Sequence, residues 1–92
     1  MTELEKRLEE RKTELDTRLK ERFEWKVVEG DIYYKLEDGS ALTLMTFPHF
    51  SAIVAQFADS YDDLPAATED GDLYGIELST DEMLSAIIKD AA

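Results

Sequence analysis

The sequence predicts a small α+β domain, in which an antiparallel three-stranded meander and a short fourth strand pack with helices. The prediction rests on a long amphipathic segment at the start, three strand-like runs joined by glycine turns, and two later segments with helical spacing. The 92 residues suffice for one small domain, and 43% of them are apolar, which suffices for a core. We expect a single domain over 1–92 with the element order α-β-β-β-α-β-α, in which a helix over 2–23 precedes an acidic α+β body over 24–92.

The first segment is expected to form one amphipathic helix over 2–23. Thr2 followed by Glu5 fits a capping box, and Asp16 and Lys20 form one of several pairs of opposite charge at i,i+4. Such a helix would lie across the sheet, with a solvated charged face; a coiled-coil or dimer face is the alternative. Its apolar stripe consists of Leu4, Leu8, Leu15, Leu19 and Phe23.

Three strand-like runs follow, over 24–29, 32–37 and 41–47. Gly30-Asp31 can form the first tight turn between them. Asp38-Gly39 is a strong signal for the second, because a type I′ turn needs two residues that tolerate positive φ. These runs therefore predict an antiparallel meander.

The rest of the chain is expected to alternate helix, loop, strand and helix. A helix is expected over 48–61, an acidic loop over 62–72 and a short strand over 73–78. Ser79 followed by Glu82 is a second capping box, which begins the last helix. If the later helices covered the sheet face opposite the first helix, no apolar surface would remain; otherwise exposed aromatic residues would mark an interface. The helical spacing over 48–61 comes from Phe50, Ile53, Val54, Phe57, Ala58 and Tyr61.

Charge is distributed unevenly along the chain. Asp and Glu number 22 against 10 Lys and Arg, which gives a formal net charge of −12. Residues 1–26 are balanced, with eight acids and eight bases, whereas 36–88 hold eleven acids and neither Lys nor Arg. Such a surface repels nucleic acid and anionic membranes and attracts basic proteins, more weakly as salt rises. Acidity that serves only solubility, or a salty cytoplasm, is the alternative.

Residues suited to catalysis or metal binding are sparse. The chain has no cysteine, which excludes disulfides, thiolate zinc sites and a cysteine nucleophile. His49 is the single histidine, so it lacks a second histidine as co-ligand. Asp70-Gly71-Asp72 suggests a calcium loop, but an EF-hand aligned on it needs Gly at 73 and Glu at 79, where the chain has Leu73 and Ser79. We therefore expect that the protein is not an enzyme and that it has neither a cofactor nor a metal site.

The sequence gives no sign of membrane insertion or export. No apolar run reaches the roughly 18 residues of a membrane span. The start of the chain lacks the basic region and apolar stretch of a signal peptide. We expect a cytoplasmic protein without membrane contact.

The acidic residues of the body are the candidate partner-binding residues. Carboxylates on one face of a strand recur about every 6.6–7 Å, and duplex DNA presents about one charge per 1.7 Å of its axis. A folded array of carboxylates can therefore occupy the basic channel of a nucleic-acid-handling protein and exclude the nucleic acid. The residues expected to make this contact are Glu37, Asp38, Asp59, Asp62, Asp63, Glu69, Asp70, Asp72 and Glu77.

In its small size, its lack of Lys and Arg over 36–88, and its helix followed by a hairpin over 30–40, the chain resembles the small acidic inhibitors that phages make against host defence. These include anti-CRISPR and anti-restriction proteins. The resemblance implies a DNA mimic or competitive inhibitor of a nuclease complex, acting in the host cytoplasm. Proteins of this kind have many unrelated folds, so no functional residue is carried over. Two alternatives remain: an immunity protein for a nuclease toxin, and an adaptor subunit that dimerises or assembles through helix 2–23.

Overall fold

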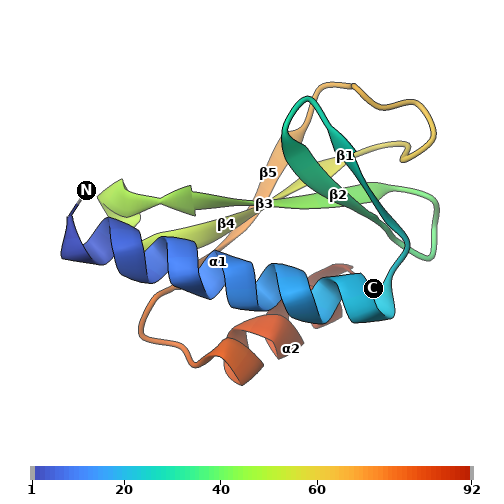
Figure 1. Cartoon of the computed structure of the whole chain (residues 1–92). Helices are drawn as coiled ribbons and strands as arrows, with labels where there is room; N and C mark the ends of the chain where they lie inside the picture. Colours follow the sequence, from blue (N-terminus) through green and yellow to red (C-terminus); the bar gives the residue numbers. More distant parts are fainter. Residues whose placement is uncertain (1, 92) are drawn as a thin grey trace.

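The chain forms two helices and one five-stranded sheet, in the order α-β-β-β-β-β-α (Figure 1). This count refers to residues 2–91, which the computed structural model describes apart from the side chain of Asp70. The predicted α+β class is confirmed, and the elements form one compact domain. The elements are α1 (Glu3–Arg22), β1 (Trp25–Val28), β2 (Asp31–Lys35), β3 (Ala41–Phe47), the short 3₁₀ helix η1 (Pro48–Phe50), β4 (Ala52–Ala58), β5 (Glu69–Gly75) and α2 (Thr80–Ala91).

Each strand pairs antiparallel with its neighbour in the sequence, which gives the sheet order β1-β2-β3-β4-β5. In the turn between β1 and β2, Glu29 and Gly30 have φ values of 53° and 88°, as a type I′ turn requires. In the turn between β2 and β3, Gly39 alone has a positive φ, of 88°, and its N–H donates to the carbonyl of Leu36 at 3.0 Å. The type I′ turn predicted at Asp38-Gly39 is therefore replaced by a turn that ends in a left-handed glycine.

The helix predicted over 48–61 is wrong, because this segment forms η1 and the central strand β4. Its i, i+3, i+4 spacing also fits a strand that is buried on both faces. Ile53 and Ala55 enter the main core on one face of β4, while Val54 and Ala58 are buried on the other. Branched side chains such as those of Ile53 and Val54 favour strands, and pairing with β3 and β5 satisfies the backbone on both sides.

The strand predicted over 73–78 begins earlier, at Glu69, and ends at Gly75. Its register against β4 places Glu69 opposite Phe57 and Leu73 opposite Val54, with an irregularity between Val54 and Gln56. Backbone pairing with a central strand thus includes acidic residues that have low strand propensity. The predicted loop over 62–72 is shorter for the same reason.

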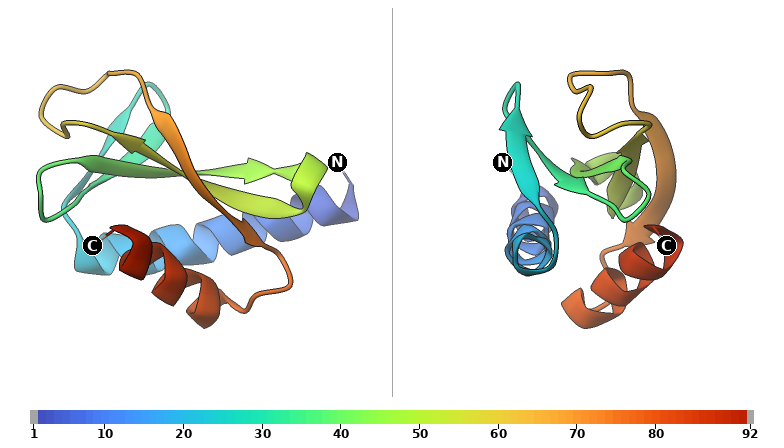
Figure 2. Two further views of the ribbon diagram at one scale, coloured as in Figure 1. Left: turned by 180° about the vertical axis from the view of Figure 1, so that it is seen from behind. Right: turned by 90° about the vertical axis from the view of Figure 1, so that its right-hand side faces the viewer.

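Both helices pack against one face of the sheet, as Figures 1 and 2 show. α1 contacts β2, β3 and β4, which confirms a helix lying across the sheet. Its 20 residues span about 30 Å at ~1.5 Å per residue, most of the 36 Å length of the domain. The fully buried side chains between the helices and the sheet are Leu8, Leu15, Leu19, Tyr34, Leu42, Ile53, Met83 and Ile87.

The opposite face of the sheet is only partly covered. A small cluster of Tyr33, Ala41, Ala58 and Tyr61 is buried there, and Leu64 packs on it from the loop between β4 and β5. The prediction that later helices would cover this face fails because the segment assigned to one of them is β4 itself. Within residues 2–91 the remainder of this face has no helix over it (Figure 2).

Polar contacts fix both helix starts and join α1 to α2. The backbone N–H of Glu5 donates to Thr2 Oγ1 at 3.1 Å, which is one half of the predicted capping box, and the Glu5 carboxylate accepts from the Thr2 hydroxyl at 3.0 Å. Ser79 and Glu82 form the full reciprocal capping box, with both bonds at 3.1 Å. The contacts between α1 and the start of α2 are Arg18 to Asp81 at 2.6 Å, Thr80 to Glu14 at 2.7 Å, and Arg11 to the carbonyl of Leu78.

Candidate functional site

Two loops that carry acidic residues meet at one end of the sheet. The turn between β2 and β3 lies beside the loop between β4 and β5, because the N–H of Tyr61 donates to the carbonyl of Gly39 at 2.9 Å. Ala41 and Ala58, which flank these loops, are paired in the sheet. We call the five exposed carboxylates on these loops the acidic end: Glu37, Asp38, Asp59, Asp62 and Asp63.

Buried side chains hold the acidic end in place. Tyr61 is only 3% exposed and lies between Asp59 and the Asp62-Asp63 pair in the sequence. Leu64, which follows Asp63, packs on the buried cluster that contains Tyr61. The loop is therefore anchored on both sides of its acidic residues, and its carboxylates project from a packed support.

Two lysines lie close to the acidic end, although the sequence from 36 to 88 contains none. Lys26 Nζ is 4.3 Å and Lys35 Nζ is 6.0 Å from the centroid of the Tyr61 ring. Burial raises the pKa of the Tyr61 phenol, and the charges of Glu24 and Asp62 raise it further. The cation-free stretch of the sequence is thus not cation-free in space, because both ammonium groups lie near the Tyr61 ring that supports the acidic end.

Asp38 has a fixed orientation within the β2–β3 turn. Its Oδ1 accepts hydrogen bonds from the Ser40 N–H at 2.9 Å and from Ser40 Oγ at 2.5 Å. Both bonds favour the ionised form, so they hold the pKa of the Asp38 carboxyl below its usual value. Asp38 is therefore charged and oriented at neutral pH.

A groove of about 240 Å³ opens beside this turn. Its apolar lining comes from three segments that are distant in the sequence. Glu37 and Asp38 form its acidic rim. Since the rim residues also belong to the acidic end, the groove and the acidic end form one continuous surface. The apolar lining residues are Phe23, Leu36, Ile88 and Ala91.

The other predicted partner-binding residues are not part of the acidic end. Glu69 is exposed at the first position of β5, and Asp72 lies further along that strand, toward α2. Glu77 is exposed beyond β5, with its carboxylate against Gly75. The side chain of Asp70 lies outside the described part of the chain. Of the predicted acids, Glu69, Asp72 and Glu77 therefore lie outside the two loops that form the acidic end.

Asp72 of β5 and Asp90 of α2 place two carboxylates side by side. A hydrogen bond shared with Asp90, and repulsion from its charge, raise the pKa of Asp72. The Tyr74 hydroxyl donates to Asp90 Oδ2 at 2.8 Å. Burial raises the pKa of Tyr74, and so do its bond to Asp90 and the charge of that carboxylate. The contact between β5 and α2 is thus weakened by repulsion when both acids are ionised.

Replacing Asp72 with asparagine is expected to raise the midpoint of thermal unfolding at pH 7. The folded chain binds the Asp72 proton more tightly than the unfolded chain, so the favourable contribution of Asp72 is complete below its unfolded pKa of about 4. That contribution is lost as pH rises through the raised folded pKa. The gain from Asp72→Asn should therefore shrink as pH falls from 7 to about 4, with exposed Glu10→Gln as the control. A gain of equal size at every pH would contradict the repulsion.

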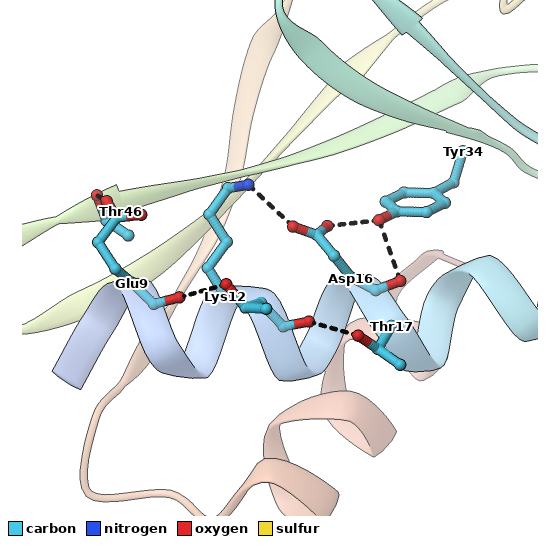
Figure 3. Close-up of polar contacts among 7 residues, drawn as sticks. Glu9, Lys12, Asp16, Thr17, Tyr34 and Thr46 are labelled. Atoms are coloured by element: carbon cyan, nitrogen blue, oxygen red, sulfur yellow. Dashed lines mark hydrogen bonds and ion pairs between the residues drawn. The ribbon is translucent and has the colours of Figure 1, made fainter. Parts of the chain in front are cut away.

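A buried polar network joins α1 to β2 (Figure 3). Asp16 is only 6% exposed, and its Oδ2 lies 2.9 Å from Lys12 Nζ. The Tyr34 hydroxyl donates to Asp16 Oδ1, and burial and this bond raise the pKa of Tyr34. Asp16 thus pairs with Lys12 and Tyr34, and the predicted i,i+4 pair with Lys20 is replaced. All these groups have partners inside the domain, so the network has a structural role.

This network was not predicted from the sequence. Asp16 comes directly after Leu15 and three residues before Leu19, so it lies at the flank of the apolar stripe. That position was the available signal for a buried carboxylate. Its partner Tyr34, 18 residues away, could be identified only from the three-dimensional structure.

An apolar patch is exposed on the sheet face without helices. Met45 is opposite Val54, which is opposite Leu73, so the three side chains form a row across β3, β4 and β5. Met45 is 46% and Leu73 50% exposed. Phe47 and Phe50 extend the patch, with ring centroids 5.0 Å apart. The prediction of a helix over 48–61 concealed this patch, because it assigned Val54 to a helix core.

Over residues 2–91, with the side chain of Asp70 left aside, no group of three or more His, Cys, Asp or Glu side chains is arranged to hold a metal ion. The same part of the chain has no helix long and apolar enough to cross a membrane. His49 is exposed in η1, with its ring 6.4 Å from that of Phe47. The acidic end with its groove and the exposed apolar patch are thus two candidate contact surfaces of the described chain.

Comparisons with protein-family models, curated proteins and solved structures found no match to the chain. The charge, burial and geometry of the acidic end are therefore the basis for proposing a function.

Proposed function

We propose that this is a non-enzymatic binding protein whose acidic end docks on a basic, nucleic-acid-handling protein and inhibits it. The observation that carries this proposal is the junction of the two acidic loops, which the bond from Tyr61 to Gly39 holds together. Burial of Tyr61 beneath the loops supports a fixed rather than a variable spacing of the carboxylates. A preformed anionic surface loses little conformational entropy when it binds.

Competition with nucleic acid is the proposed mode of inhibition. A net charge of −12 gives attraction to a basic channel at long range, which raises the rate of association at low salt. Carboxylates in that channel would occupy the contacts that phosphates make. This is the DNA mimicry that the resemblance to phage anti-CRISPR and anti-restriction inhibitors implies, with a cytoplasmic site of action.

The two alternatives place different demands on the surface. An immunity protein for a nuclease toxin would use the same acidic end, so the identity of the bound protein distinguishes it. An adaptor that dimerises through α1 would have to form the dimer contact with the charged outer face of this helix, because Leu8, Leu15 and Leu19 are fully buried within one chain.

Binding to a basic partner is expected to be sensitive to both salt and DNA. The immobilised protein is incubated with nuclease-treated cell lysate, and bound proteins are eluted between 50 and 200 mM salt or with duplex DNA and identified by mass spectrometry. We expect a basic nucleic-acid-binding protein to elute within this salt range and to be displaced by DNA. If the bound proteins neither eluted between 50 and 200 mM salt nor were displaced by duplex DNA, the proposal would be overturned.

A pair of variants of equal net charge locates the contact. The triple variant Asp59→Asn, Asp62→Asn, Asp63→Asn should weaken binding of the identified partner by about tenfold or more, roughly 1.4 kcal/mol. The control Glu3→Gln, Glu10→Gln, Glu21→Gln removes the same charge from α1 and should retain binding. Equal losses in the two variants would mean that only overall charge matters, which contradicts docking through the acidic end.

A further inference from the structure

The groove beside the β2–β3 turn combines an apolar floor with a negatively charged rim. Phe23 follows the last residue of α1, while Ile88 and Ala91 belong to the last turn of α2. Leu36 joins them from the start of the β2–β3 turn and is itself 5% exposed. Figures 1 and 2 show the ends of α1 and α2 on the same side of the domain as this turn. The floor is thus an opening into the end of the main core.

Three sources of negative potential converge on this groove. Glu37 and Asp38 supply two carboxylates at its rim, and Asp38 is held ionised by Ser40. The C-terminal ends of α1 and α2 supply the third, because the last carbonyls of a helix carry partial negative charge. The basic residues of these last turns are Lys20, Arg22 and Lys89, and none of them lines the groove.

We propose that the groove receives one arginine side chain of the basic partner. The aliphatic stem of the arginine packs on Phe23, Ile88 and Ala91, and its guanidinium group pairs with Glu37 and Asp38. The inference rests on the proposed function, since the arginine belongs to the nucleic-acid-handling partner whose surface the acidic end contacts.

Charge complementarity and desolvation favour arginine among long side chains. Its guanidinium group is planar, presents five N–H donors and is more weakly hydrated than an ammonium group, so it binds two carboxylates at lower desolvation cost. Its three-carbon stem gains contact with apolar surface while the charged head stays at the rim. A neutral side chain of the same length would leave both carboxylates without a counter-charge.

The test uses Nα-acetyl-arginine amide as the probe and the whole ¹⁵N-labelled chain as the receptor. We expect saturable chemical-shift changes at the backbone amides of residues 23, 36–38 and 88–91, with a Kd of about 1–10 mM, or roughly 3–4 kcal/mol. Nα-acetyl-citrulline amide has the same stem without the charge, and guanidinium chloride has the charge without the stem. Each should bind at least several-fold more weakly than the arginine amide.

Matched single variants locate the site. Glu37→Gln should weaken binding of the arginine amide about threefold or more, whereas Asp62→Asn, with the same charge change outside the groove, should leave it unchanged. If the citrulline amide bound as tightly as the arginine amide, the inference would be overturned. Chemical-shift changes spread over the whole acidic end would overturn it too.

The outcome separates this inference from the proposed function. If the arginine amide does not bind, while the Asp59, Asp62 and Asp63 variant still loses a DNA-displaced partner, the arginine site is wrong and the proposed function stands. If the amide binds but no partner is displaced by DNA, the proposed function fails, and with it the assignment of the arginine to that partner.

Discussion

Replacing Leu15 with alanine is expected to lower the free energy of unfolding by about 2–5 kcal/mol. Leu15 is fully buried where α1 crosses the sheet, and the smaller side chain would leave a cavity in the main core. A domain of this size is stable by only about 5–15 kcal/mol, so the loss is a large fraction of the total. Urea denaturation followed by circular dichroism would measure it.

Thr17→Ala is the matched control for this substitution. Thr17 lies two residues further along α1 on the exposed face, where its hydroxyl donates to the Thr13 carbonyl at 3.0 Å. Its replacement should change the free energy of unfolding by no more than about 0.5 kcal/mol. A similarly small change for Leu15→Ala would contradict the packing of α1.

Replacing Asp16 with alanine is expected to cost about 1.5–3 kcal/mol, the range for losing a buried hydrogen bond to a charged group. The change removes the carboxylate that accepts from the buried Tyr34 hydroxyl, which keeps only the long contact of 3.4 Å to the Asp16 backbone carbonyl, and it removes the ion pair with Lys12. Tyr34→Phe removes only the hydroxyl and should cost about 1–3 kcal/mol. The two substitutions share one hydrogen bond, so their combined effect in urea denaturation should be smaller than the sum of the single effects, by about 0.5–3 kcal/mol.

The exposed residue Glu21 provides the comparison for the Asp16 network. Glu21→Ala removes a carboxylate from the same helix at a position open to solvent, and it should change stability by less than about 0.5 kcal/mol. Strict additivity of Asp16→Ala and Tyr34→Phe would show that the two residues do not interact in solution.

Features that depend on a few neighbouring residues could be predicted from the sequence. Both helix starts were predicted, because Thr2 with Glu5, and Ser79 with Glu82, form contacts three residues apart. β3 was predicted with its observed bounds, since glycine and proline signals flank it. The 48–61 segment was misassigned because helical spacing and burial on two strand faces give similar apolar patterns.

The proposed binding surface depends on contacts between distant segments, which the sequence does not specify. The acidic residues were recognised as a group, but the acidic end exists because Tyr61 bonds to Gly39, 22 residues earlier. The groove forms where Phe23, Leu36 and Ile88 meet. These residues come from three distant segments whose relative positions follow from packing. Lys26 and Lys35 approach the acidic end for the same reason, although the chain separates them from most of its acids.

The order of the strands has a consequence for how the domain is assembled. Each strand pairs only with the strand before or after it, and β3 and β4 are separated by just four residues, including η1. Sheet formation therefore requires the closure of loops of two to ten residues, and the entropy lost in closing a loop rises only slowly with its length. The packing of α1 and α2 on the sheet and on each other then joins segments far apart in the chain. Domains dominated by such local contacts belong to the faster-folding sheet proteins, which limits the time for which their unpaired edges can meet other chains.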